Sequence, residues 1–168
     1  MSADIKKKLS TPLIICLSFT TVLAAAALFD FFFLDLARRT FVFYTLKEGT
    51  VVVEDRMLRH ADTREGDIIR YTEETLLGPV TPDLLPLFPK ETKLMSLLYR
   101  GGVVYINFSS DAAIPPLEGG VAYDNFNTLH TGILRNFSYV NDVHFFIEGT
   151  SVYVEGFTRD NIKMFFWN

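Results

Sequence analysis

Two apolar segments flanking Gly101-Gly102, within residues 92–109, constrain the fold more than any other feature of this sequence. A Gly-Gly pair between such segments indicates a tight β-hairpin, because glycine adopts the positive φ angles that type I′ and II′ turns require. Strand alternation places Val104, Ile106 and Phe108 on one face of the second segment. In the first segment it places two sets on opposite faces: Leu94, Ser96 and Leu98, and Met95, Leu97 and Tyr99. One face of the hairpin needs a cover, and the neighbouring helices are the candidates.

The first 40 residues are typical of a membrane segment rather than of a soluble fold. Lysines at positions 6–8 precede an uncharged apolar run over residues 13–29, and apolar residues resume after Asp30. About 20 apolar residues are needed to cross a bilayer. Residues 13–34 reach this length if the Asp30 carboxylate lies at the far interface. The leading lysines predict a cytoplasmic N-terminus, although Arg38 and Arg39 after the span weaken the asymmetry.

A cleaved signal peptide is the alternative to an uncleaved, single-pass signal-anchor. The alanines at positions 24–27 offer a cleavage site. We favour the anchor because the aromatic-rich apolar run continues past them. Cys16, the single cysteine, is a poor lipidation site, since Ile15 precedes it and the apolar stretch before it is short. We expect a membrane-buried thiol there.

Beyond residue 40, periodicity predicts a small α/β domain. Strands are expected at residues 40–45, 51–53, 143–147 and 151–155, with a charged edge following the second strand at Glu54, Asp55 and Arg56. A helix should begin at Asp62, with Glu65 completing a capping box, and end at Gly78. A second helix is expected at residues 123–137. Four prolines predict a stiff loop, without helix or strand, over residues 79–90.

Each predicted helix has one apolar stripe. The stripes consist of Ile68, Ile69, Thr72 and Leu76, and of Phe126, Leu129, Ile133 and Phe137. This order of elements predicts an α/β fold of the α+β type: a two-layer sandwich in which two helices cover one face of a small mixed sheet.

Several short motifs resemble the GerM-type (GerMN, sporulation and spore-germination) domain. They are Leu77-Gly78-Pro79, the PKETKL step at residues 89–94, the glycine-centred hairpin ending at Ser109, Asn127-Thr128-Leu129, and the strand within residues 140–149. Glu148 departs from the commoner Asp of that pattern. The resemblance covers residues 41–157, which leaves residues 1–40 as the anchor and 158–168 as an aromatic tail.

The resemblance implies an envelope-facing, non-catalytic domain, similar in fold to the ring-building motifs of secretion and sporulation rings. The resemblance implies a domain type and a compartment. It does not imply a role in sporulation or the formation of a ring, because this chain has one copy of the domain and no lipobox. The aromatic segment from Phe157 to Trp167, which includes most of this tail, is a candidate docking element.

Chemistry-bearing residues do not form a recognisable site in the sequence. The formal charge of -4 argues against nucleic-acid binding. His60, His130 and His144 lack metal-ligand spacing, and we expect His130 to be a packed or half-exposed residue rather than a ligand. Other candidates have structural explanations: a turn for Ser109-Ser110-Asp111, and a solvated edge for Glu54-Asp55 with Asp62. We therefore predict no catalytic, cofactor-binding or metal-binding residue.

Two functional hypotheses follow. The favoured one is a membrane-anchored bacterial cell-envelope protein, not an enzyme, whose extracytoplasmic domain binds envelope partners or itself as an assembly module. The alternative is an envelope ligand-binding or peptidoglycan-related hydrolytic protein. Its site would lie between the loops at residues 79–89 and 110–120.

Overall fold

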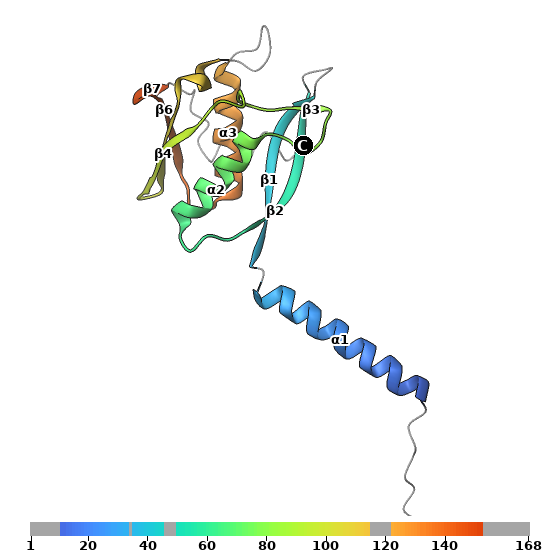
Figure 1. The fold of residues 1–168 in the computed structure, drawn as a ribbon. Coiled ribbons are helices and arrows are strands. Elements are labelled where there is room, and N and C mark those ends of the chain that lie inside the picture. The colour runs from blue at the N-terminus through green and yellow to red at the C-terminus, as the bar shows by residue number, and fades with distance from the viewer. Residues whose placement is uncertain (1–10, 34, 46–49, 115–121, 153–168) are drawn as a thin grey trace, which may run out of the picture. The chain divides into compact units, whose positions relative to one another are not determined.

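The computed structural model describes residues 11–33, 35–45, 50–114 and 122–152 of the chain. The chain divides into two units, Met1–Leu36 and Ala37–Asn168. The described part of the first unit is essentially one helix, α1, and the second unit contains a mixed α+β domain (Figure 1).

Helix α1 (Thr11–Phe33) coincides with the predicted membrane segment. Pro12–Phe29 has a mean hydropathy of 2.2 and is long enough to cross a bilayer, and none of this stretch is buried. The hydroxyl groups of Ser18 and Thr21 donate to carbonyls one turn earlier, which satisfies them within the helix. An apolar helix is therefore confirmed. A signal sequence meets the same criteria, so retention of the helix stays a prediction.

A four-stranded mixed sheet in the order β4-β5-β6-β7 contains the predicted hairpin. β4 (Leu94–Arg100) and β5 (Val103–Phe108) pair antiparallel around Gly101 and Gly102, whose φ angles of 60° and 87° confirm the glycine turn. A 3-10 turn, η1 (Ser110–Ala113), follows. β6 (Asp142–Ile147) runs parallel to β5, and β7 (Thr150–Val152) returns antiparallel to β6.

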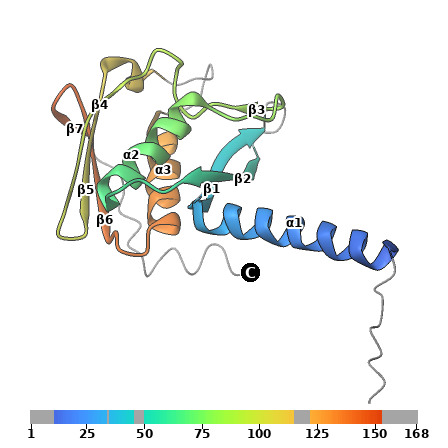
Figure 2. The ribbon, with the colours of Figure 1, turned by 60° about the horizontal axis from the view of Figure 1, so that its bottom comes forward.

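Two helices, α2 (Arg64–Leu77) and α3 (Ala122–Asn136), cover one face of this sheet. The hairpin residues predicted to share the covered face, Val104, Ile106 and Phe108, are all 0% exposed. The predicted sheet with two helices on one face is thus confirmed. The views in Figures 1 and 2 both place the helices between this sheet and a second, smaller sheet.

The second sheet has the order β2-β1-β3. β1 (Leu36–Thr45) begins four residues before the predicted strand, and β2 (Val51–Arg59) extends through the predicted charged edge. β3 (Leu84–Leu85) pairs antiparallel with Tyr44 and Thr45 of β1. The prediction that residues 79–90 contain no strand is therefore wrong, because two leucines of the loop complete the edge of β1.

The start of α2 also differs from the prediction. The N-cap is Thr63, whose side chain accepts a hydrogen bond from the Gly66 amide, rather than Asp62. The Glu65 side chain does not form the predicted capping-box hydrogen bond. Its carboxylate instead accepts a hydrogen bond of 2.8 Å from the Tyr99 amide. This bond satisfies a backbone group on the edge of β4, which is the open edge of the four-stranded sheet.

The alternation of side chains in β4 differs from the prediction because the strand contains a β-bulge. The pairing register shifts between Leu94 and Ser96, so one extra residue enters the strand there. Leu94 consequently packs against the core together with Leu97 and Tyr99, whereas Leu98 stays exposed.

The core lies between the two sheets and is strongly aromatic. The ring of Phe41 stacks on Tyr71, and Tyr71 meets Phe137 edge to face. Gly132 of α3 makes this arrangement possible, because a side chain at that position would collide with the Tyr71 hydroxyl. The largest fully buried side chains are Tyr71, Phe41, Phe43, Phe88, Phe108, Phe126, Phe137, Phe145, Ile68, Leu87, Ile106 and Leu129.

Candidate functional site

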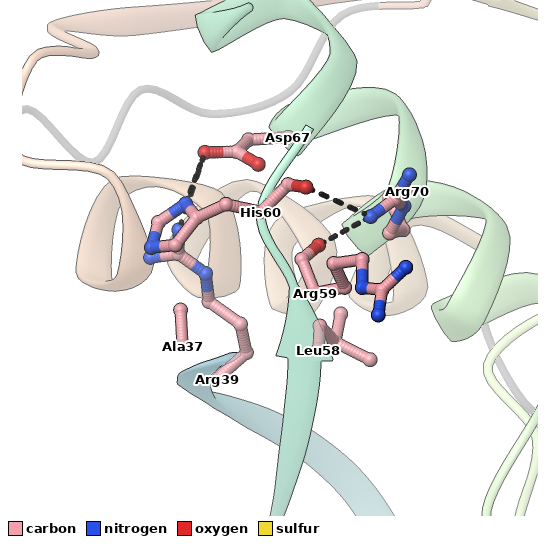
Figure 3. A pocket seen from close by; sticks show the side chains of 7 residues that line it. All are labelled: Ala37, Arg39, Leu58, Arg59, His60, Asp67 and Arg70. Atoms are coloured by element: carbon pink, nitrogen blue, oxygen red, sulfur yellow. Dashed lines mark hydrogen bonds and ion pairs between the residues drawn. The ribbon is translucent and has the colours of Figure 1, made fainter. Parts of the chain in front are cut away.

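A shallow hollow, open to solvent, lies where β1 begins and β2 ends. Figure 3 shows the side chains that line it, drawn from β1, β2 and α2. The residues are Ala37, Arg39, Leu58, Arg59, His60, Asp67 and Arg70. Three arginines and a histidine thus surround a single carboxylate.

Asp67 organises one side of the hollow. Its carboxylate accepts hydrogen bonds from His60 Nδ1 at 2.9 Å and from the Ala61 amide at 2.7 Å, and it lies 3.6 Å from the Arg39 guanidinium. Partial burial opposes ionisation, but these hydrogen bonds and the positive charge of Arg39 outweigh it and hold the pKa of Asp67 below its ordinary value. Asp67 is therefore an ionised structural group rather than a proton donor.

Arg39 has a structural role. Its Nη1 donates to the Asn136 carbonyl at 2.9 Å, and its guanidinium lies 4.5 Å from the centre of the Phe137 ring. Its side chain is only 14% exposed. Arg39 therefore joins β1 to the end of α3 and is poorly placed to bind an external ligand.

Arg70 and Arg59 form the accessible side. Arg70 donates through one nitrogen to the carbonyls of Arg59 and His60, as Figure 3 shows. The exposed Arg59 side chain has no hydrogen bond or ion pair within the described part of the chain. Free guanidinium N–H groups are strong donors to phosphate or carboxylate oxygens. The accessible side of the hollow is therefore rich in hydrogen-bond donors.

The titratable groups in the lining of the hollow are three arginines, His60 and Asp67. Its lining contains no serine, cysteine or threonine nucleophile. Across the described residues, no group of three or more His, Cys, Asp or Glu side chains is placed to hold a metal ion.

Two of the three histidines lie together elsewhere, on either side of Asp142. His130 is 2% exposed, so of the packed and half-exposed alternatives the packed one holds, and its Nε2 lies 3.6 Å from an Asp142 carboxylate oxygen. Burial lowers the pKa of His130, and the Asp142 carboxylate offsets part of this effect. The exposed His144 lies 3.4 Å from Asp142 and stacks on Tyr105.

The other sequence candidates are structural. The Ser109 hydroxyl accepts from the Lys93 amide and donates to Asp111, as expected for a turn. Glu54 and Asp55 form no cluster with Asp62. Asp55 pairs with Arg38, which fits an exposed edge. Glu54 is not part of a solvated edge, since its side chain is 13% exposed.

Glu54 and Arg56 instead join β2 to the end of α2. Glu54 accepts from the Val80 and Thr81 amides, and Arg56 donates to the Gly78 carbonyl at 2.7 Å. The Arg56 guanidinium also lies 4.7 Å from the centre of the Phe41 ring. This ion pair is a link between elements, not a functional site.

The outer face of the four-stranded sheet carries a second candidate surface. Leu98, Tyr105 and His144 occupy one row across β4, β5 and β6, and Leu98 and Tyr105 are 53% and 38% exposed. The aromatic tail, predicted as a docking element, lies outside the described residues. So does part of the loop at residues 110–120 that would frame the predicted ligand pocket.

Comparison with solved structures defines the class of fold. The tandem GerMN domains of the sporulation protein GerM from Bacillus subtilis superpose with a TM-score of 0.51 at 17% identity, over 69% of this chain and 40% of that one. The first GerMN domain of the same protein gives a TM-score of 0.51 at 15% identity, over 69% and 86% of the two chains. This chain therefore spans two fifths of the length of the tandem structure. The domain has a GerMN-type fold.

The family follows from the sequence match. Residues 41–153 match the model of the Germane family, described as sporulation and spore germination. The chain belongs to this family, which confirms the resemblance seen in its motifs. A search of curated proteins finds no significant match.

The arginine-lined hollow was not predicted from the sequence. In the sequence, Arg38 and Arg39 bear on membrane topology, and neither belongs to a binding motif. The available signal was the concentration of arginine rather than lysine in residues 38–70, since arginine is the residue suited to planar hydrogen bonding with phosphate or carboxylate.

Proposed function

We propose that this protein is a membrane-anchored component of the bacterial cell envelope, whose Germane domain is a non-catalytic interaction module outside the cytoplasm. The main support for a membrane anchor is helix α1. It contains 18 consecutive residues with a mean hydropathy of 2.2, and none of them is buried. A soluble protein gains nothing from such an exposed apolar helix, whereas a bilayer covers it.

The direction of insertion follows from the flanking charge. Lys6, Lys7 and Lys8 precede the helix, and cytoplasmic flanks carry an excess of lysine and arginine. The arginines after the helix are partly accounted for by the fold: Arg38 pairs with Asp55, and Arg39 binds the end of α3. The Germane domain then lies on the extracytoplasmic side.

The interaction role rests on what the described domain offers. Its polar clusters serve packing and strand edges, and its accessible features are the arginine-lined side of the hollow and the row containing Leu98 and Tyr105. Exposed apolar groups beside polar ones are typical of binding surfaces. The partner is an envelope protein or a second copy of this chain.

Cysteine labelling in intact cells tests the topology. In a Cys16→Ser background, a membrane-impermeant maleimide should label Asp62→Cys before lysis and Ser2→Cys only after lysis. The intact mass of the purified chain shows whether α1 is retained. Labelling of both positions only after lysis would contradict export of the domain.

Photo-crosslinking tests the interaction role. A photoreactive residue at Leu98 should yield one defined crosslinked species in cells, identified by mass spectrometry as this chain or an envelope protein. The same residue at the exposed Glu73 of α2 serves as a control and should give none. If the domain also stays monomeric at high concentration and Leu98 gives no product, the interaction role is wrong.

A further inference from the structure

We propose that β2 pairs antiparallel with the β2 strand of a second copy of this chain, about a two-fold axis at Met57. This inference rests on the interaction role proposed above, for which it names one partner and one surface, and it does not depend on the anchor. The surface, called the β2 edge here, is the side of β2 that faces away from β1.

Two contacts define how β1 and β2 face each other. The Thr45 amide donates to the Thr50 carbonyl at 2.9 Å, and the Thr40 hydroxyl donates to the Asp55 carboxylate at 2.8 Å. Both contacts fit one antiparallel register, in which the even-numbered residues of β2 direct their N–H and C=O groups toward β1. The backbone of Thr40 agrees, since its groups bond to Asn136 on the other side of β1. The odd-numbered residues of β2 therefore direct their backbone groups to the β2 edge.

Most of the β2 edge is open. Four residues direct N–H and C=O groups to this side without a hydrogen-bond partner among the described residues: Val51, Val53, Asp55 and Met57. At the end of the strand, the Arg59 carbonyl accepts from Arg70 (Figure 3). An unpaired row of backbone groups is a template for a further strand.

The other outer strands of the described domain are protected. In β4 the Tyr99 amide is satisfied by Glu65, and β7 and β3 contain only three and two residues. β2 has nine residues and no proline. Glu54 and Arg56, which were expected to guard it, face the fold and are only 13% and 11% exposed. The β2 edge is therefore the longest unprotected strand edge in the part of the chain that the structure describes.

The side chains beside the β2 edge are mostly apolar. Val51, Val53 and Met57 are 55%, 45% and 57% exposed. They alternate with inward-facing residues along the strand, so they share its outer surface. Exposed apolar residues on a long, unpaired edge strand mark a site of association with another strand.

Charge complementarity indicates a second copy as the other strand. When two β2 strands pair antiparallel with Met57 opposite its equivalent, Asp55 of each copy lies opposite Arg59 of the other. Arg59 is exposed, and its guanidinium has no hydrogen bond or ion pair within the described part of the chain. Asp55 is ionised, because the hydrogen bond from Arg38 holds its pKa below the ordinary value. One edge thus supplies both members of an ion pair, which forms twice about the axis.

Neighbouring registers are less complementary. A two-fold axis at Asp55 would place two carboxylates directly opposite each other, and like charges in that position are destabilising. An axis one residue further along would oppose Asp55 to the apolar Met57. The register centred on Met57 also accommodates the bond from Arg70, because the Arg59 carbonyl has a second lone pair for the Asp55 amide of the other copy.

A cysteine scan of the full chain in detergent micelles tests this geometry. In the Cys16→Ser background, Met57→Cys places two thiols opposite each other with Cα atoms about 5.5 Å apart, which is within the range of a disulfide. Mild oxidation with copper phenanthroline should therefore give a disulfide-linked dimer. Val53→Cys is the matched control on the same edge. Its two copies would lie roughly 27 Å apart along the strands and should give little dimer.

Sedimentation of the full chain in density-matched detergent measures association without a crosslink. Met57→Lys should raise the dissociation constant of the dimer about tenfold or more, because it places two ammonium groups opposite each other. Arg59→Glu should also weaken the dimer, whereas Arg59→Lys keeps the charge and should preserve it. Arg100→Glu makes the same charge change at an exposed residue of β4 and is the control that should leave the dimer intact. Circular dichroism verifies that each variant is folded.

The remaining outcomes separate this inference from the interaction role. A chain that stays monomeric overturns the inference, and so does a Val53→Cys variant that crosslinks as well as Met57→Cys. An edge covered by another segment of the same chain or by an envelope protein would prevent the Met57 crosslink and overturn it too. A dimer that survives Met57→Lys uses another surface, so the inference fails and the interaction role stands. If the chain is monomeric and Leu98 also yields no crosslinked product in cells, the interaction role itself fails.

Discussion

The side-chain amide of Asn136 pairs with the backbone of Thr40 as a neighbouring strand would. Asn136 Oδ1 accepts from the Thr40 amide at 2.8 Å, and Asn136 Nδ2 donates to the Thr40 carbonyl at 2.7 Å. Further along the strand, β3 takes over this edge at Tyr44. The last residue of α3 thus satisfies the part of β1 that no strand reaches.

Replacing Asn136 should therefore destabilise the domain more than the replacement of a typical polar side chain does. Asn136→Ala leaves both backbone groups of Thr40 without this partner, and we expect a loss of about 2–4 kcal/mol in the free energy of unfolding. Urea denaturation measures it. Asn141→Ala, at an exposed asparagine, is the matched control and should cost less than about 0.5 kcal/mol. Similar losses in both variants would contradict the pairing role.

Gly132 and Tyr71 should be energetically coupled. In Gly132→Ala the new methyl group collides with the Tyr71 hydroxyl, while it lies 3.4 Å from the ring carbon Cζ, which is ordinary contact. We expect Gly132→Ala to cost about 1–3 kcal/mol. Tyr71→Phe removes the colliding oxygen, so the same glycine substitution should cost little in that background.

A double-mutant cycle by urea denaturation gives the coupling between the two sites. Tyr71→Phe alone is a necessary control, because it also removes a hydrogen bond of 3.1 Å to the Thr40 carbonyl. Purely additive effects would show that the glycine serves another purpose.

Glu65 should protect the edge of β4 from association. Its carboxylate satisfies the Tyr99 amide, which points away from β5, on the open edge of the sheet. Glu65→Ala frees this group, and an unpaired strand edge is a template for pairing with another chain. We expect greater self-association of the variant in analytical ultracentrifugation as concentration rises.

Glu73→Ala is the control for this experiment, since Glu73 is exposed on the same helix and carries the same charge. An equal increase in association for both variants would attribute the effect to net charge rather than to the edge.

His130 should make the domain less stable as pH falls. Burial lowers its pKa in the folded state, while the pKa in the unfolded chain is about 6.5. Below pH 6.5 the unfolded chain therefore binds the proton first, and stability is lost until the pH passes the folded pKa. His130→Leu should flatten this dependence between pH 7 and pH 5.

Urea denaturation at several pH values checks the effect of His130. Asp142 and His144 face the same position, so His144→Gln is the control and should retain most of the slope. An unchanged slope in His130→Leu would assign the acid sensitivity to other groups.

Elements that depend on residues close together in the sequence could be predicted. Elements that depend on pairing between segments far apart in the sequence could not. The Gly101-Gly102 turn and the apolar faces of both helices follow from residues a few positions apart. β3 consists of two leucines in a proline-rich segment, and it exists because β1 has an open edge there. The bulge near Leu94 inserts one residue, which alternation alone cannot locate.

The hollow was hidden for the same reason. Asp67 and Arg39 lie 3.6 Å apart in space but on different elements, and neither belongs to a motif of its own. Asp62 and Thr63 are both favourable cap residues, so propensity alone does not place the start of the helix. The choice of Thr63 leaves Glu65 free to reach Tyr99.

The position of β1 has a consequence for the order of folding. β1 is the first strand of the domain to be synthesised, and β2 follows it directly. A lone two-stranded hairpin is marginally stable in water. Its other edge waits for β3 and finally for Asn136, which lies 96 residues after Thr40. The first strand of the domain therefore gains its last partner only after residue 136 has been synthesised, so its pairing is among the later steps in folding.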